Sequence, residues 1–70
     1  MMPLTFLPEG DTGTVLRIGG KPEIKKHLEN LGFVAGSTVK IITKMGGSVV
    51  VQVKEARIAI SEEMAQKIMI

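Results

Sequence analysis

The chain has no cysteine, no tryptophan, no tyrosine and a single histidine, His27. Without cysteine, neither a disulfide nor a thiolate metal site can staple the fold, so its stability depends on packing. One histidine cannot complete a selective transition-metal site in a monomer, and we expect only weak, nonspecific metal ion binding and no cofactor. His27 lies one turn after Glu23, which favours an ordinary position on a helix surface.

Groups that could catalyse a reaction are equally scarce. The serines occupy turn or cap contexts, where a hydroxyl has a structural role. Gly20-Lys21 resembles a phosphate loop, but that motif needs Gly in place of Val15 and Ser or Thr in place of Pro22. We predict that the protein is not an enzyme.

Long apolar runs and a strong net charge are also missing. No segment approaches the roughly 20 apolar residues of a membrane span, and the N-terminus lacks the features of a secretory signal. A cytoplasmic location is therefore expected. The net charge is +2, with nine basic and seven acidic residues interspersed, and only Phe6 and Phe33 could stack on bases. This argues against nucleic acid as a partner.

Hydrophobic residues make up 44% of the 70 residues, which is enough for one small core. We expect a single domain over residues 1–70. Leu7–Gly10 has the pattern of a type I turn, and the alternation of Thr14–Ile18 predicts a strand. Ile24, Leu28 and Leu31 form the apolar stripe of a helix over Pro22–Leu31, with Gly32 and Phe33 set to end it in a Schellman motif.

Two further strands are predicted over Val39–Lys44 and Val49–Val53. A three-residue loop, Met45–Gly47, pairs Thr43 with Val49, Ile41 with Val51 and Val39 with Val53, and so buries one consistent face. A two-residue Gly46-Gly47 turn would set Lys44 and Lys40 beside the valine row. The three-residue loop is therefore preferred, with Gly47 in the left-handed region and Ile42 opposite Val50 on the outer face.

Arg57–Ile60 predicts a last strand, with Ile58 and Ile60 on one face. Ser61 then has the position of an N-cap, and Met64, Ala65 and Ile68 are expected on one side of a short terminal helix. Short strands with tight turns indicate a mainly β fold, a small barrel with one inserted α-helix and a short C-terminal helix.

The predicted register leaves two features free to bind a partner. One is the outward pair Ile42 and Val50, and the other is the basic helix face of Lys21, Lys25 and Lys26. Alternatively, the pair is covered by Met64, Ile68 or Leu4, and the lysines are a solvated helix face.

The segment Leu28-x-x-Leu31-Gly32-Phe33-x-x-Gly36-x-x-Val39 resembles the FeoA family of ferrous-iron transport accessory proteins. The resemblance runs from the turn at Gly10 to the terminal helix at Ser61. The chain departs from the family pattern at three places. Members often have Pro at the position of Ala35, an aromatic residue near Ala56, and a longer central hairpin than Met45 to Ser48.

The resemblance implies a Src-homology-3-like barrel that binds the cytosolic part of FeoB, the membrane ferrous-iron transporter, and reaches the membrane only through it. Two alternatives stay open. One is a nucleic-acid-binding small barrel, and the other is a metal-sensing domain like the C-terminal domain of iron-dependent repressors.

Overall fold

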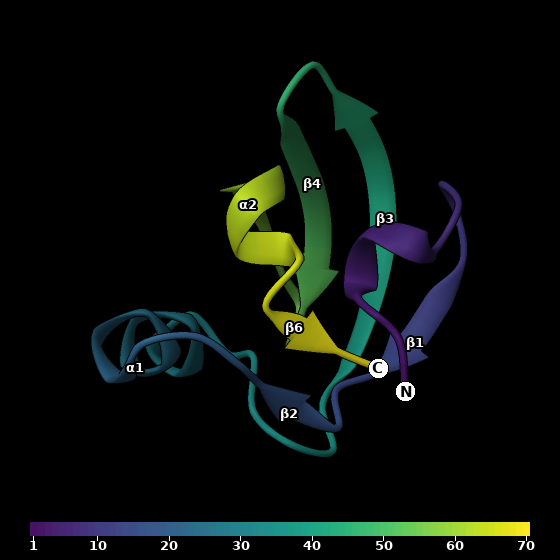
Figure 1. Ribbon diagram of the computed structural model, residues 1–70. Helices are drawn as coiled ribbons and strands as arrows, with labels where there is room; N and C mark the ends of the chain where they lie inside the picture. The colour runs from purple at the N-terminus through teal and green to yellow at the C-terminus, as the bar shows by residue number, and fades with distance from the viewer.

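The computed structural model describes residues 1–70 as a mainly β chain with two antiparallel sheets (Figure 1). The larger sheet has the strand order β1-β3-β4-β5, and the smaller one pairs β2 with β6. In chain order the elements are the 3-10 helix η1 (Leu4–Phe6), β1 (Thr12–Thr14), β2 (Arg17–Ile18), α1 (Pro22–Asn30), β3 (Thr38–Met45), β4 (Ser48–Val53), β5 (Ala56–Ser61), α2 (Glu62–Ala65) and β6 (Ile68–Met69).

The first turn lies one residue later than the sequence predicts. The N–H of Asp11 donates to the carbonyl of Pro8 at 3.2 Å, so the turn spans Pro8–Asp11 instead of Leu7–Gly10. Gly10 has φ +88°, and a positive φ at the third position belongs to a type II turn. The prediction of a type I turn was wrong because it placed this glycine at the fourth position, where no positive φ is needed.

The single strand predicted over Thr14–Ile18 is divided between the two sheets. β1 pairs with β3, and β2 pairs with β6. Val15 and Ile18 are buried while Leu16 is 53% exposed, so the alternation does not continue through this segment. The prediction failed because the chain leaves one sheet and enters the other at Val15-Leu16, which a period-2 pattern cannot indicate.

Helix α1 begins at Pro22, as predicted, and ends in the predicted Schellman motif. The N–H of Phe33 donates to the Leu28 carbonyl at 3.0 Å, and the N–H of Gly32 donates to the Glu29 carbonyl at 3.0 Å. Gly32 adopts φ +112°, which favours glycine. Phe33 and Leu28 are both fully buried, so the cap also fixes the helix against the core.

The central hairpin has a two-residue loop, Gly46-Gly47, between the paired Met45 and Ser48. The predicted three-residue loop was therefore wrong, although Gly47 does adopt a positive φ of +80°. Lys44 pairs with the buried Val49, the arrangement that the sequence argued against. It is tolerated because the ammonium of Lys44 extends to the Thr5 carbonyl, with Nζ donating at 2.9 Å.

A β-bulge at Ile42 restores the register that the sequence predicts deeper in the hairpin. Because Ile42 is an extra residue in β3, Ile41 still pairs with Val51 and Val39 with Val53. The valine row is therefore continuous despite the shorter loop.

The C-terminal segment confirms the cap but not the length of the helix. The Oγ of Ser61 accepts a 3.1 Å hydrogen bond from the Met64 N–H. Ile68, predicted on this helix, lies instead in β6 and pairs with Ile18 of β2. On its other side β6 meets the N-terminal segment, where Met2 and Ile70 exchange backbone hydrogen bonds of 2.9 and 2.8 Å.

One core lies between the inner face of the larger sheet and the helices. Figure 1 shows α2 and η1 in front of the sheet and α1 to one side, and α2 contacts both β4 and β5. The fully or largely buried residues are Leu4, Leu7, Val15, Ile18, Leu28, Phe33, Val39, Ile41, Val49, Val51, Val53, Ile60, Ala65 and Ile68.

Candidate partner-binding surface

The larger sheet has a buried inner face and an outer face open to solvent. Side chains alternate along each strand, and the inner positions of β4 are the buried Val49, Val51 and Val53. The outer positions are exposed or half-buried, and carry Lys40, Val50, Gln52, Arg57 and Ala59. No charged or polar side chain is buried in the chain, so its polar chemistry is on such surfaces.

Ile42 and Val50 are half-buried and do not belong to the hydrophobic core. Thr43, not Ile42, lies directly opposite Val50, because the bulge moves Ile42 out of register. Ala59 is opposite Val50 on the other side. The outer face therefore carries a modest apolar strip rather than the tight pair that the sequence predicted.

The proposed intramolecular covers of this strip lie elsewhere. Leu4 and Ile68 are fully buried in the core, and Met64 packs against that core. All three are thus on the inner side of the sheet. None of the three therefore covers the outer face of the sheet.

A cationic row crosses the outer face beside this strip. Lys40 is opposite Gln52, and Gln52 is opposite Arg57, so the three side chains are neighbours across three strands. A shallow hollow of about 330 Å³ adjoins the row, lined by Thr38, Lys40, Gln52, Lys54 and Glu55. Sequence reasoning missed this row, although pairing β4 with β5 around a two-residue Lys54-Glu55 turn would have found it.

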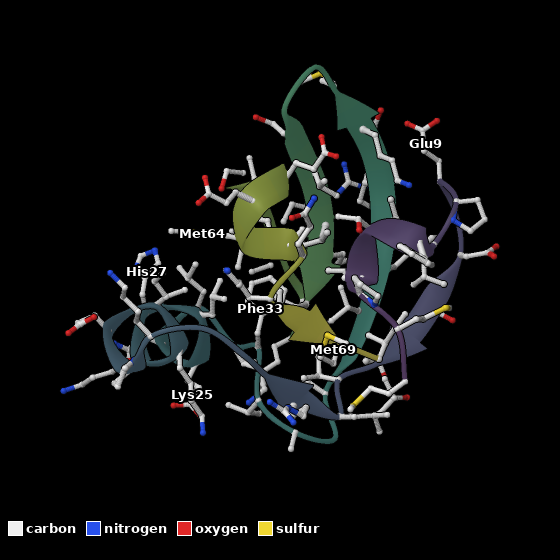
Figure 2. The ribbon with its side chains drawn as sticks, viewed as in Figure 1. Glu9, Lys25, His27, Phe33, Met64 and Met69 are labelled. Atoms are coloured by element: carbon white, nitrogen blue, oxygen red, sulfur yellow. The ribbon has the colours of Figure 1, made fainter.

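The predicted basic face of α1 is exposed, with Lys21 at the N-cap and Lys25 and Lys26 within the helix. Figure 2 shows Lys25 and His27 projecting from α1 in different directions, away from the rest of the molecule. Leu28 of the same helix is in the core on the inner side of the sheet. The structure thus separates these lysines from Ile42 and Val50 instead of joining them in one patch.

Glu9 connects the N-terminal turn to the tip of the hairpin. Its Oε2 accepts hydrogen bonds from the Thr43 hydroxyl at 2.6 Å and from the Lys44 backbone N–H at 2.7 Å. These bonds favour the charged carboxylate, the one from Thr43 most strongly, and lower the pKa of Glu9. The clamp holds β3 in place beyond its bulge.

Side chains that could bind a metal ion are not gathered anywhere in the chain. No three His, Cys, Asp or Glu side chains lie close enough together to hold a metal ion. A second hollow of about 260 Å³ is lined mainly by the glycine loop of the hairpin with Thr5, Lys44 and Glu62. No helix is long and apolar enough to cross a membrane.

Comparison with known families gives one match over almost the whole chain. A model of the family described as the FeoA domain matches residues 2–70. No match was found among curated proteins.

Similar solved structures support the same fold. An iron uptake regulatory protein (FeoA) has 28% identity and a TM-score of 0.87, with 97% of this chain and 90% of that chain covered. The FeoA of Stenotrophomonas maltophilia, complexed with zinc and described as a prokaryotic SH3 domain protein, has 29% identity and a TM-score of 0.85, with 99% and 88% covered. The predicted Src-homology-3-like fold class is thereby confirmed.

A manganese-dependent transcriptional repressor shares the fold as well. Its identity is 26% and its TM-score 0.86, with 94% of this chain covered. This chain spans only 38% of the length of that repressor. The likeness is therefore to one part of a larger protein.

Proposed function

Because this chain belongs to the FeoA family, we propose that it is a non-catalytic cytoplasmic accessory protein that binds the cytosolic part of a FeoB-type ferrous iron transporter. The family match and the FeoA neighbours support a role in ferrous iron transport. The transporter as partner follows from what the family resemblance implies.

The observation that carries the proposal is the match to the FeoA domain over residues 2–70. The surface fits such a role. The outer sheet face combines a half-buried apolar strip at Ile42 and Val50 with the cations Lys40 and Arg57. Protein interfaces commonly combine an apolar centre with a polar rim.

Binding is tested by titrating isotope-labelled protein with the soluble cytosolic domain of the transporter and following backbone amide shifts. We expect saturable shifts that cluster on one surface. Variants with Lys21, Lys25 and Lys26 changed to Glu test the helix face separately, with a salt series to detect an electrostatic contribution. An absence of shifts at concentrations well above micromolar would refute the proposal.

A metal-sensing role is the second candidate, favoured by the likeness to the manganese-dependent repressor. Anaerobic calorimetry with ferrous iron distinguishes it from the accessory role. One-to-one micromolar binding that is lost in His27→Ala would favour the sensor. Weak binding that survives this substitution would favour the accessory protein.

A further inference from the structure

Strand β5 is a free edge of the larger sheet, since only β4 pairs with it. It is a regular six-residue strand, and its pairing with β4 has no bulge from Val53 and Ala56 to Ser48 and Ser61. Other proteins protect such edges with proline, bulges or inward charges. β5 contains no proline and no bulge. Its single charged residue, Arg57, has its side chain on the outer face of the sheet and not on the inner one.

The backbone groups of β5 that face away from β4 can be identified from the hydrogen-bond ladder. The Glu62 N–H donates to the Gly47 carbonyl at 2.9 Å, which extends the ladder one pair beyond Ser48 and Ser61. Hydrogen-bonded pairs alternate along an antiparallel ladder, so Ile58 and Ile60 also bond to β4. The N–H and C=O groups of Arg57 and Ala59 consequently point away from β4, in the plane of the sheet, toward its free edge.

Nothing in the molecule satisfies these outward groups. No backbone hydrogen bond outside the helices and strands involves Arg57 or Ala59, and both residues are exposed. The other long strands lie inside the sheet. At the opposite edge β1 has only three residues, and β6 is flanked by β2 on one side and by Met2 and Pro3 on the other.

The side chains around the edge indicate what would bind there. Arg57 lies on the outer face in one row with Gln52 and Lys40, and Lys54 stands in the adjoining turn with the single acid Glu55. Ile58, between the two outward-facing residues, is half-buried on the inner side. A strand added beside β5 would place its side chains opposite these residues on alternating faces.

We propose that β5 accepts an extended acidic segment of the partner protein as an additional strand, with an Asp or Glu opposite Arg57 and an apolar residue opposite Ile58. Main-chain hydrogen bonds to Arg57 and Ala59 provide the affinity of such strand addition, and the alternating side chains provide its specificity. The inference deepens the proposed function and rests on it for the identity of the protein that supplies the segment.

Two substitutions test the edge without requiring the fold to change. Ala59→Pro removes an N–H that makes no bond within the sheet, and proline is accepted at such edge positions. It should weaken binding at least about tenfold, because the added strand loses a hydrogen bond and meets the ring. Ala59→Val is the matched control, because it keeps the N–H and should bind normally. Arg57→Glu should weaken an acidic segment by a similar factor and salt should reproduce part of that loss.

Two probes separate this inference from the proposed function. The first is the soluble cytosolic domain of the transporter, and the second is a synthetic peptide that alternates Glu with Val, compared with one that alternates Lys with Val. We expect both the domain and the acidic peptide to slow hydrogen exchange at Arg57 and Ala59, and the basic peptide to have no such effect.

The outcomes are distinct. The transporter domain could bind without slowing hydrogen exchange at these two amides, and bind Ala59→Pro as tightly as the unmodified protein. This result would refute strand addition while sustaining the proposed function. Binding of the acidic peptide at the edge without binding of the transporter domain would sustain strand addition and refute the transporter as the partner. Protection that grows with the concentration of the protein alone would identify a second copy as the occupant, and tighter binding of single-stranded DNA than of the acidic peptide would identify nucleic acid. Either result would overturn the proposal.

Discussion

The Thr43 hydroxyl donates a 2.6 Å hydrogen bond to the carboxylate of Glu9, 34 residues away in the sequence. The same oxygen accepts the Lys44 backbone N–H. Both donors lie just beyond the bulge in β3, so the clamp joins the N-terminal turn to the hairpin where the strand changes register.

The clamp predicts an acid-dependent loss of stability. Because the pKa of Glu9 is lowered in the folded protein, the carboxylate contributes stability above its ordinary pKa of 4.5, and this contribution is lost as the pH falls through the lowered value. Glu9→Gln should be less stable than the unmodified protein at neutral pH, and the difference should shrink on acidification. Urea unfolding between about pH 6 and pH 3 measures it, with Glu29→Gln on the exposed face of α1 as control. A constant difference across this range would contradict the argument.

Ile42 and Ile41 are neighbours in β3 that should respond oppositely to charge. Ile42→Lys adds an ammonium at a half-buried outer position and should change the unfolding free energy by about 0.5 kcal/mol or less. Ile41→Lys places the ammonium in the core and should lower the unfolding free energy by several kcal/mol, roughly the cost of removing an unpaired charge from water. Circular-dichroism melts distinguish the two. A large loss of stability in Ile42→Lys would remove Ile42 and Val50 from the candidate surface.

The turn between β4 and β5 is strained. Lys54 and Glu55 both have positive φ, at 49° and 67°, without being glycine or asparagine. Such conformations cost roughly 1 kcal/mol each for ordinary residues. Replacing Lys54→Asn and Glu55→Gly together should therefore stabilise the protein by about 1 kcal/mol, since Asn-Gly is preferred in two-residue hairpin turns. The control Lys54→Gln with Glu55→Gln removes the same charges without relieving the strain, and an equal gain there would attribute the effect to charge.

The loop before β3 should accept the proline that FeoA proteins often carry at Ala35. The Ser37 N–H donates to the Val34 carbonyl at 2.9 Å, and Gly36 has φ +91°, so Ala35 occupies the second position of a type II turn, which favours proline. The Ala35 N–H makes no backbone hydrogen bond that proline would remove. Ala35→Pro should therefore raise the unfolding free energy by about 0.4–1 kcal/mol. Gly36→Ala is the opposite control and should destabilise the protein. Its new methyl group would meet no neighbouring atom, but alanine disfavours the positive φ of this position.

Local signals in the sequence were sufficient for the parts of the fold that depend on neighbouring residues. Pro22, Gly32 and Phe33 fixed the limits of α1, and Ser61 fixed the start of α2. The valine alternation identified the inner face of β4. These features are determined within a few residues of the chain, where capping and side-chain period act.

The errors arose where distant segments decide the structure. Lys44 lies beside Val49 with its ammonium on the Thr5 carbonyl, and the bulge at Ile42 restores the predicted register beyond it. Ile68 left the predicted helix because β2 was available as a strand partner. On the candidate surface, Val50 lies on the outer face as predicted, but Thr43 and not Ile42 lies opposite it. The cationic row was missed because Arg57 joins it only when β5 is paired with β4, and no such pairing was predicted from the sequence.

The exchange of hydrogen bonds between Met2 and Ile70 has a consequence for the folding rate. The β3-β4-β5 meander joins residues that are close in sequence, whereas β6 can pair only after nearly the whole chain has closed into a loop, which is entropically costly. We therefore expect the meander to form in the transition state and the β6 contacts to form after it. Ile68→Val should then speed unfolding and leave the refolding rate nearly unchanged, while Val51→Ala should slow refolding. Stopped-flow chevrons of the two variants would show whether the pairing of the chain ends is the last step, and hence the step that sets how long the native state survives.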